Sequence, residues 1–583
     1  MIRIILKQVK QYKKASILTP LFAVLEVIME VLIPFVIASI VDKGVSKGNM
    51  QAVYFYGGIM ILLAMCSLLF GFLAGKYAAE ASSGLAYNLR DGMYANIQRF
   101  SFSNIDKFST AGLITRMTTD VTNLQNAYQM VLRIAVRAPM MLVSSMFMCF
   151  FINHKLSLIF VVAIIFLSVL LICIMLTVMK IFDVAFKQYD AMNASVQENI
   201  TAIRVVKSFV REQHEKKKFN QASDSICRIF TKADSILALN SPVMMMTIYG
   251  CVLSLSWFGA KYVVAGLLTT GELTSMFSYI MSILMSLMML SMIFVMLTMS
   301  MASVKRIAGV LQEEPDIQNP ENPLMEIADG SIDFHDVHFA YKQDSREDTL
   351  KDINLHIEAG QTIGIIGSTG CGKSSLVSLI SRLYDVSKGS VCIGGRDVRE
   401  YDMEVLRNQV AVVLQKNVLF SGTILENLRW GNESATEEEC KEACIQACAD
   451  DFVMQLPNQY HTHIEQGGSN VSGGQKQRLC IARALLKKPK VLILDDSTSA
   501  VDTATDAKIR KAFVKSIPGT TKIIIAQRIS SVQDADQILV MESGKIQGMG
   551  THEELLETNA IYREIYETQV KGGGDFDVAG GTN

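Results

Sequence analysis

Apolar residues are concentrated in the first half of the chain, where they form six long stretches. About 20 apolar residues are enough for a helix to cross the hydrocarbon core of a bilayer. The pattern therefore predicts six membrane-spanning helices, at about 17–41, 54–79, 130–152, 156–182, 243–267 and 273–300. The first stretch is too long for the core of a signal peptide and no small-residue cleavage site follows it, so we expect it to remain as an anchor.

Two long polar connections lie between these spans, at about 80–129 and 183–242. Their apolar residues recur at helical spacing. We therefore expect the second and third spans, and likewise the fourth and fifth, to continue well beyond the bilayer as two long helical hairpins. Short helices near 103–110 and 206–212 are expected where the chain reverses.

The second half of the chain has the pattern of a separate soluble domain. A polar segment with Pro315, Pro320 and Pro323 follows the last span, and short apolar runs with glycine turns begin near Asp329. The expected fold is an all-α membrane domain of six helices with long cytoplasmic extensions, followed by an α/β domain. We place the domains at 1–310 (membrane), 311–328 (linker), 329–571 (α/β) and 572–583 (a flexible tail).

Composition and charge agree with this division. The mean hydropathy is +0.29 and half of the residues are hydrophobic, which is too apolar for an ordinary soluble protein. The formal net charge is −1 and the basic residues are dispersed, so we expect no nucleic-acid partner. Residues 1–14 carry five basic residues and no acid. By the positive-inside rule, the N-terminus and the α/β domain then face the cytoplasm, in a multi-pass protein of the cell membrane.

The eleven cysteines are scattered without CxxC pairs, which fits a reducing compartment better than a disulfide scaffold. Cys440, Cys444 and Cys448 recur every four residues and would lie on one face of a helix. A metal site and ordinary helix packing are the alternatives. We favour packing, because thiolate metal sites usually add a fourth ligand and a loop geometry.

A glycine-rich sequence, Gly367-Ser-Thr-Gly-Cys-Gly-Lys-Ser374, follows a run that is typical of a buried strand. In this context the G-x-x-x-x-G-K-S pattern strongly indicates a phosphate-binding loop. Backbone N–H groups would cradle phosphate, Lys373 would reach the terminal phosphates, and Ser374 would ligate Mg²⁺. The predicted nucleotide-binding residues of this loop are Gly367, Ser368, Thr369, Gly370, Cys371, Gly372, Lys373, Ser374 and Ser375.

A second apolar run, Val491–Asp495, ends in a carboxylate that is placed to hold the water shell of Mg²⁺. The next residue, Asp496, stands where a general base would polarise the attacking water. Its side chain is one methylene shorter than that of glutamate, and a displacement of about 1 Å can cost orders of magnitude in rate. The sequence therefore predicts weak or absent ATP hydrolysis at this site.

The sequence Val471-Ser-Gly-Gly-Gln475 resembles the signature loop of ATP-binding cassette exporters. The resemblance covers essentially the whole chain and implies ATP and Mg²⁺ as ligands, with Ser374, Gln415 and Asp495 on the metal side. It also implies that Tyr341 stacks on adenine, that Gln415 is the Q-loop glutamine, and that residues 499–502, with Asp502, form the D-loop. In that family two nucleotide-binding domains face each other head to tail. The signature residues would then complete the ATP site of a second chain: Ser472, Gly473, Gly474 and Gln475.

Two positions depart from the family's pattern, and both belong to one site. The family's catalytic glutamate is Asp496 here, and its switch histidine is Gln527. A glutamine can hydrogen-bond the γ-phosphate but cannot carry a proton as histidine does. The chain thus resembles the degenerate half of heterodimeric multidrug exporters. This implies a partner half-transporter that brings the intact glutamate and histidine.

The function that the resemblance implies is ATP-driven export of hydrophobic or amphipathic molecules, with hydrolysis mainly at the partner's site. Two alternatives stay open: a slow homodimeric exporter of lipid or peptide, and an ATP-gated membrane regulator that moves no substrate. An importer is disfavoured, because the spans and the nucleotide-binding domain share one chain.

Two features of the spans also leave alternatives open. Glu26 and Glu30 lie one helical turn apart, and carboxylates inside a membrane are costly enough to indicate function. They either bind a cation or proton, or they face a wet cavity or pair with Arg133 or Arg137. Methionines in the sixth span suit a pocket for varied apolar ligands, or simply face lipid and neighbouring helices. They are Met276, Met281, Met285, Met288, Met289, Met292, Met296 and Met299.

Overall fold

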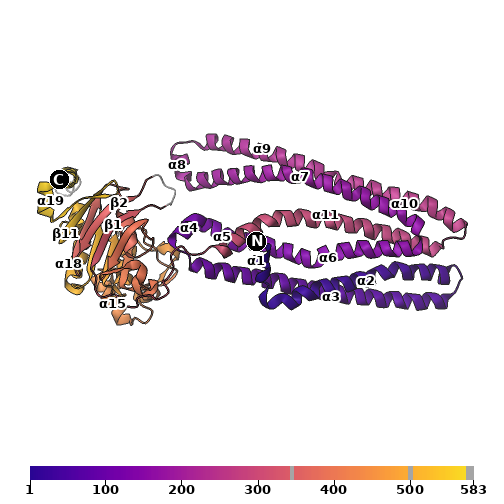
Figure 1. Cartoon of the computed structure of the whole chain (residues 1–583), viewed down its shortest axis with the longest axis horizontal. Coiled ribbons are helices and arrows are strands. Elements are labelled where there is room, and N and C mark those ends of the chain that lie inside the picture. Colours follow the sequence, from indigo (N-terminus) through magenta and orange to yellow (C-terminus); the bar gives the residue numbers. More distant parts are fainter. Residues whose placement is uncertain (342–346, 497–502, 573–583) are drawn as a thin grey trace. The chain divides into compact units, whose positions relative to one another are not determined.

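The computed structural model describes residues 1–341, 347–496 and 503–572, which form two compact units (Figure 1). The helical unit comprises Met1–Gln98 and Ser109–Glu313. The α/β unit comprises Arg99–Phe108 and the chain from Glu314 onward. The predicted D-loop with Asp502 lies outside the described residues, and so does the predicted tail apart from its first residue.

The helical unit contains the predicted spans. Within the described residues, six helical segments are long and apolar enough to cross a membrane: Lys10–Val45, Met50–Gln98, Thr110–Ile152, His154–Phe182, Glu212–Val264 and Thr270–Gln312. The prediction of six spans is therefore confirmed. The helices of this unit are α1 (Ile2–Lys7), α2 (Lys13–Ser39), α3 (Met50–Gln98), α5 (Thr110–Thr115), α6 (Val121–Ile152), α7 (His154–Thr201), α8 (Ile203–Ser208), α9 (Glu212–Ala238), α10 (Asn240–Val264) and α11 (Thr270–Gln312).

Polar side chains determine where the long helices begin. Thr269 and Glu272 form a capping box at the start of α11, and Asn153 accepts hydrogen bonds from the first N–H groups of α7. Asp42 accepts a hydrogen bond from the Gly271 N–H at 2.8 Å. A carboxylate at a helix N-terminus is favourable, so Asp42 ties the end of the first span to the start of the sixth.

Charged side chains inside the helical unit form ion pairs. Arg137 Nη2 lies 2.7 Å from Glu30 Oε2, and Arg137 Nε lies 3.6 Å from Glu26 Oε1. Of the alternatives for the two glutamates, pairing with Arg137 is the one observed. Arg306 Nε of α11 donates at 2.7 Å to Asp120, which directly precedes α6 and is 1% exposed. A carboxylate buried to this degree needs such a partner to offset its lost hydration.

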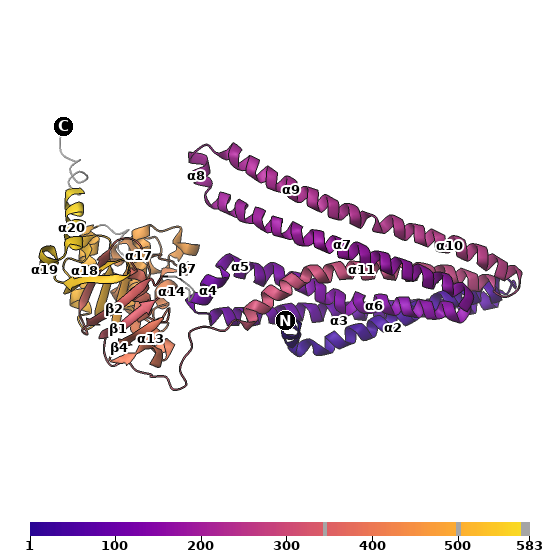
Figure 2. The same cartoon turned by 45° about the horizontal axis from the view of Figure 1, so that its top comes forward.

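The second long connection forms a helical hairpin. Helices α7 and α9 run side by side, and α8 closes the hairpin at its tip (Figures 1 and 2). The short helix expected near 206–212 is α8, which begins slightly earlier, at Ile203. Around this tip Val205, Phe209 and Val210 are exposed, the last two by 72% and 79%. Three large apolar side chains thus lie in solvent beside one short helix.

The first long connection is divided between the two units. Helix α4 (Phe102–Phe108), the short helix expected near 103–110, belongs to the α/β unit. Ser103 Oγ donates to Asp316 Oδ2 at 2.7 Å across a sequence separation of 213 residues. The Tyr384 hydroxyl donates to Asp106 Oδ2 at 2.9 Å. These contacts make α4 an integral part of the α/β unit.

Glycines allow α3 to pack closely against the N-terminal segment. A Cβ atom at Gly84 would overlap the ring of Tyr12, whereas a Cβ at Gly58 on the same helix would meet no atom within 4 Å. We expect Gly84→Val to lower the free energy of unfolding by about 1–3 kcal/mol through overpacking. Gly58→Val makes the same change in helix propensity and should cost less. Thermal unfolding of the full chain in detergent checks this, and equal midpoints for the two variants would contradict it.

The α/β unit is built on two larger sheets and a two-stranded ribbon, counted over the described residues. The six-stranded sheet has the order β12-β11-β3-β10-β9-β6, parallel except for the edge strand β12. The four-stranded antiparallel sheet has the order β2-β1-β4-β5. The strands β9 and β10 are buried along their whole length, as expected of parallel strands covered on both faces. The predicted fold class is therefore confirmed.

The strands of this unit are β1 (Ile332–Phe339), β2 (Leu350–Ile357), β3 (Thr362–Gly367), β4 (Lys388–Ile393), β5 (Arg396–Asp397), β6 (Val410–Val413), β7 (Gly422–Thr423), β8 (His463–Ile464), β9 (Val491–Asp495), β10 (Thr521–Ile525), β11 (Gln537–Glu542) and β12 (Lys545–Gly550). Besides α4, its helices are α12 (Lys373–Ile380), α13 (Met403–Gln409), α14 (Ile424–Arg429), α15 (Glu437–Gln446), α16 (Asp450–Val453), α17 (Gly473–Leu485), α18 (Thr503–Ser516), α19 (His552–Thr558) and α20 (Ala560–Gly572).

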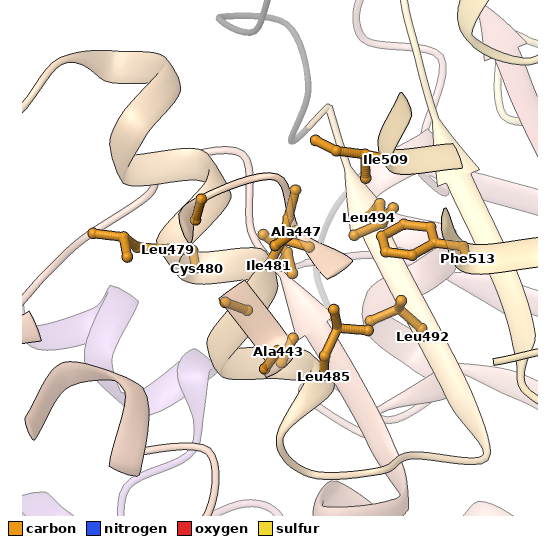
Figure 3. Close-up of a cluster of buried hydrophobic side chains, with 14 of the residues drawn as sticks. Ala443, Ala447, Leu479, Cys480, Ile481, Leu485, Leu492, Leu494, Ile509 and Phe513 are labelled. Carbon is orange, nitrogen blue, oxygen red and sulfur yellow. The ribbon is translucent and has the colours of Figure 1, made fainter. Parts of the chain in front are cut away.

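A core cluster holds α17 and α18 against the six-stranded sheet. Figure 3 shows Leu485 of α17 beside Leu492 of β9, and Ile509 and Phe513 of α18 beside Leu494 of the same strand. Each of these five side chains is at most 6% exposed. Burial of this kind stabilises by roughly 1.5–3 kcal/mol per large side chain. The packing fixes β9 and thereby the carboxylates at its end.

The cysteines of α15 pack inside the unit. Cys440 and Cys444 are buried, and burial raises the pKa of the Cys444 thiol to about 12, so this thiol stays protonated. Within the described residues, the one cluster with ligand atoms close enough for a metal is Asp336, His338 and Asp352, and it contains no cysteine. The packing interpretation of the cysteines is therefore the one the structure supports.

Candidate nucleotide-binding site

The glycine-rich loop joins β3 to α12, as the sequence predicts. Strand β3 is paired in parallel with both β10 and β11, so the loop leaves from the middle of the sheet. Gly372 is the N-cap of α12 with a φ of +99°, and a Cβ there would lie 2.7 Å from Leu350 Cδ2. Glycine is the residue that adopts this conformation without strain. The first N–H groups of α12 are thereby available to an anion.

The lysine and serine at the start of α12 contact the loop and β9. Lys373 Nζ donates to the carbonyl oxygens of Gly367 and Ser368, each at 2.8 Å. Ser374 Oγ donates to Asp495 Oδ1 at 2.9 Å. Burial raises the pKa of the Asp495 carboxyl, and the neighbouring Asp496 adds to this effect. A bound cation would favour the ionised carboxylate, and a hydroxyl beside a carboxylate is an oxygen donor pair that fits Mg²⁺.

Asp496 is held by two amide side chains. Gln527 Nε2 donates to Asp496 Oδ2 at 2.7 Å, and Gln415 Nε2 donates to the same oxygen at 3.3 Å. The φ of Asp496 is +47°, in the left-handed region that residues other than glycine seldom adopt. The residue is 8% exposed. Backbone strain, burial and two donors therefore coincide at the position of the predicted general base.

One pocket collects most of the predicted site residues. Its volume is about 330 Å³, within the range of small-molecule sites. The predicted residues that line it are Tyr341, Thr369, Gly370, Gly372, Lys373, Ser374, Ser375, Gln415, Asp495, Asp496 and Gln527. Gly367, Ser368 and Cys371 belong to the same loop, where Cys371 is 2% exposed. The phosphate loop, the carboxylates and the amides thus face a common space.

Tyr341 lies at one edge of this pocket. Its hydroxyl is 2.9 Å from Ser375 Oγ, and its ring makes edge contacts with Phe339 and Tyr384 at centroid distances of 4.9 and 5.2 Å. The side chain is nevertheless 49% exposed. An aromatic ring that is fixed by its neighbours and open on one side offers a surface on which a planar base can stack.

The signature loop begins α17 and faces solvent. Ser472 Oγ accepts from the Gln475 N–H at 3.3 Å, and Gln475 Oε1 accepts from the Ser472 N–H at 2.9 Å, which is a capping box. Ser472 and Gly473 are exposed. Of the described residues that line the phosphate-loop pocket, none comes from 472–475. In the described part of the chain, the signature loop thus adds no residue to the lining of that pocket.

Three residues near the site carry no sequence signal. Thr349 and Ile525 line the pocket, the first from the turn before β2 and the second from the end of β10. Gln569, in α20, hydrogen-bonds the backbone of the segment that contains Gln527. Each contact joins segments that are far apart in the sequence, and none of the three residues belongs to a motif.

Replacement of Lys373 should weaken nucleotide binding. We expect Lys373→Ala to raise the Kd for ATP at least about tenfold, because it removes charge-assisted hydrogen bonds to phosphate. The matched control is Lys511→Ala, an exposed lysine of α18 outside the pocket. Equilibrium titration of the full chain with a fluorescent ATP analogue measures both constants. Equal Kd values for the two variants would contradict this role of Lys373.

Comparison with known proteins identifies the family. Residues 16–305 match the family described as "ABC transporter transmembrane region", and residues 350–499 match the family described as "ABC transporter". The chain is 36% identical over 560 residues to the uncharacterized ABC transporter ATP-binding protein YfiB of Bacillus subtilis (strain 168), across 96% of this chain and 97% of that protein. It is 32% identical over 478 residues to the ATP-dependent lipid A-core flippase of Desulfotalea psychrophila (strain LSv54 / DSM 12343), across 82% and 83% of the two chains.

The fold also agrees with that of a solved protein. A bacterial Atm1-family ABC exporter with ATP bound superimposes with a TM-score of 0.80 at 22% identity, covering 98% of this chain and 99% of that one. The match includes both the six spans and the α/β domain. The chain therefore belongs to the ABC transporter family, as a multi-pass ABC exporter with its transmembrane region and its ATP-binding domain in one polypeptide.

Proposed function

We propose that this chain exports hydrophobic or amphipathic molecules, multidrug-type, across the cytoplasmic membrane as one half of a heterodimer. Its own ATP site would bind ATP with Mg²⁺ and hydrolyse it poorly, and its signature loop would complete the partner's active site. The observation that carries this proposal is the arrangement of Asp496 between Gln415 and Gln527.

The chemistry of that arrangement disfavours hydrolysis. A general base needs a free lone pair directed at the attacking water, within hydrogen-bond reach. Both amides donate to the same oxygen, Asp496 Oδ2, and the aspartate is shorter than glutamate by one methylene. Gln527 is a neutral amide and cannot accept or carry the proton that a histidine could. The phosphate loop and the two residues on the metal side, Ser374 and Asp495, keep the family's pattern. This combination supports ATP binding without efficient cleavage.

Two exposed surfaces support a second chain as partner. The signature residues Ser472 and Gly473 are exposed, and they are not among the described residues that line the chain's own phosphate-loop pocket. The tip around α8 exposes Val205, Phe209 and Val210. Exposed apolar side chains clustered at one place favour a protein contact. In exporters of this family each ATP lies between two chains, which gives the exposed signature loop an occupant.

The exposed face of α11 supports an apolar substrate. Six of the eight methionines of the sixth span are exposed by 37–66%, and they share this face with few branched residues: Met281, Met285, Met288, Met289, Met292 and Met299. Other spans expose mainly branched and aromatic side chains, such as Leu158, Val162 and Ile165 of α7. Thioether chains adapt to ligands of different shape. A methionine face therefore fits a cavity that accepts varied substrates.

The proposed cycle follows from differential binding. ATP favours the state in which two nucleotide-binding domains are closed, and closure turns the membrane cavity outward, because a ligand shifts a conformational equilibrium by its preference for one state. Hydrolysis at the partner's site would reopen the pair. ATP retained at this chain's own site would keep one side of the pair together through the cycle.

A lipid substrate is the second candidate. The lipid A-core flippase that is 32% identical to this chain acts on a lipid, as its name states. A homodimer that moves lipid slowly would use Asp496 as its own catalytic base. This candidate and the heterodimer differ in whether the chain alone turns over ATP.

The experiment that tests the proposal is Mg-ATP hydrolysis by this chain purified alone in lipid, with ATP binding measured in parallel. Binding without turnover is the expected result. Brisk turnover that is lost in Asp496→Asn would overturn the degenerate-site proposal and favour a self-sufficient homodimer. Absence of binding in a folded chain would overturn the assignment of an ATP site as well.

A further inference from the structure

We propose that Gln569, in the C-terminal helix α20, is a positioning residue that sets Gln527 against Asp496 and so controls how long ATP stays in this site. The inference rests on the proposed function, because it concerns the regulation of the same ATP site. It assigns a role to a helix that is not represented among the described residues lining the pocket.

The side-chain amide of Gln569 forms two hydrogen bonds with one short segment. Gln569 Nε2 donates to the Gln527 carbonyl oxygen at 2.7 Å. The Ile529 N–H donates to Gln569 Oε1 at 2.9 Å. One residue, Arg528, lies between the two contacted groups. The amide thus pairs with the segment as the backbone of a neighbouring strand would, and it does so immediately after β10 ends.

Gln527 is fixed at both ends by these contacts. Its carbonyl oxygen is held by Gln569, and its side-chain Nε2 donates to Asp496 Oδ2 at 2.7 Å. Ile529, two residues after Gln527, is 2% exposed and packs in the core. Between these fixed points the direction of the Gln527 side chain depends on the backbone, and Gln569 contacts that backbone on both sides of Arg528.

Packing near the start of α20 holds the helix independently of Gln569. Tyr562 is fully buried, and its hydroxyl lies 2.7 Å from His552 Nδ1. Ile565 and Tyr566 pack against the core cluster of the unit. Gln569 itself lies seven residues after Tyr562 and is exposed. A substitution at Gln569 therefore changes the contact with Gln527 while the helix stays docked through Tyr562.

The two hydrogen bonds need both functions of the amide. Glutamate at this position keeps the length and the acceptor oxygen, but it places a carboxylate oxygen against the Gln527 carbonyl, where a donor is required. Alanine removes both contacts. A role in packing alone would tolerate Gln569→Glu, since the two side chains have nearly the same shape. A positioning role predicts that Gln569→Glu is as defective as Gln569→Ala.

Nucleotide identity provides a second distinction. A glutamine at the position of Gln527 is able to hydrogen-bond the γ-phosphate, which ADP lacks. Misplacing Gln527 should therefore affect ATP and leave ADP unchanged. General loosening of the domain would affect both nucleotides.

The test measures release of labelled nucleotide, with Mg²⁺, from the full-length chain in lipid. We expect Gln569→Ala and Gln569→Glu each to speed ATP release about tenfold, as the loss of one or two hydrogen bonds would. ADP release should not change. The matched control is Thr568→Ala, at the preceding exposed position of α20, and it should behave as the wild type. In a Gln527→Ala background the effect of Gln569→Ala should disappear, because the two residues act as one unit.

A wild-type rate of ATP release in Gln569→Glu would overturn the inference. It would also be overturned if Gln569→Ala changed the release rate equally in the wild-type and the Gln527→Ala backgrounds. Thermal unfolding of each variant confirms that it is folded. A wild-type chain that binds no ATP would overturn the proposed function itself. ATP that is bound but released at an unaltered rate in all the variants would overturn only the role of Gln569.

Discussion

Asp496→Glu combined with Gln527→His is expected to raise the rate of ATP hydrolysis by this chain at least about a hundredfold. The longer carboxylate would reach the attacking water, and a positioned base contributes roughly 10²–10⁴ to such a rate. The histidine would replace an amide that now donates to Asp496 Oδ2 with a side chain that can accept and carry a proton. Phosphate release by the full chain in lipid, where a second copy supplies the signature loop, measures the gain.

The control for this gain of function is the same double variant with Lys373→Ala. Lys373 is predicted to hold the terminal phosphates, so its loss should abolish the new activity. Each single variant should gain less than the pair. Gln527 donates a hydrogen bond to Asp496, so the two positions are not independent. A double variant that binds ATP and remains inactive would show that the defect of this site lies elsewhere.

Ser472→Ala is expected to reduce ATP hydrolysis by the complete transporter at least about a hundredfold. Ser472 is exposed, and in the proposed heterodimer its hydroxyl would meet the phosphates of ATP held by the partner. Loss of one preorganised donor to a transition state costs roughly 10²–10³ in rate. ATP binding by this chain's own phosphate loop should not change. Steady-state hydrolysis by the assembled complex, alongside ATP titration of this chain alone, separates the two sites.

The structure offers a matched control for the signature-loop variant. Thr436 begins α15 with the same capping box that Ser472 forms at α17. Removing either hydroxyl should cost about 1 kcal/mol of helix-capping stability. Thr436→Ala should therefore match Ser472→Ala in thermal stability while leaving hydrolysis intact. Equal hydrolysis by both variants would refute the shared-site arrangement.

Features that depend on local sequence could be predicted. The six spans follow from the length of apolar runs, and the phosphate loop follows from glycines and a lysine within eight consecutive residues, Gly367 to Ser374. The short helices at the hairpin tips also follow from local pattern, since α4 and α8 lie close to the expected positions. In each case the residues that determine the structure are neighbours in the chain.

Features that depend on distant contacts could not be predicted. The sequence left several partners open for Glu26 and Glu30, and only packing of α2 against α6 selects Arg137. The contact of Gln569 with Gln527 joins residues 42 positions apart through a side chain that has no motif. The two donors on Asp496 were named separately by resemblance, and the fold is what brings both to the same oxygen.

The membership of α4 in the α/β unit has a consequence for how the protein can be divided. A fragment expressed from Glu314 onward would contain every strand of that unit but would lack Asp106 and Phe102, which contact Tyr384. The ring of Tyr384 would then be left uncovered next to Phe339 and Tyr341. An isolated soluble domain cut at the linker is therefore an incomplete folding unit, and a fusion that restores residues 99–108 should be more soluble.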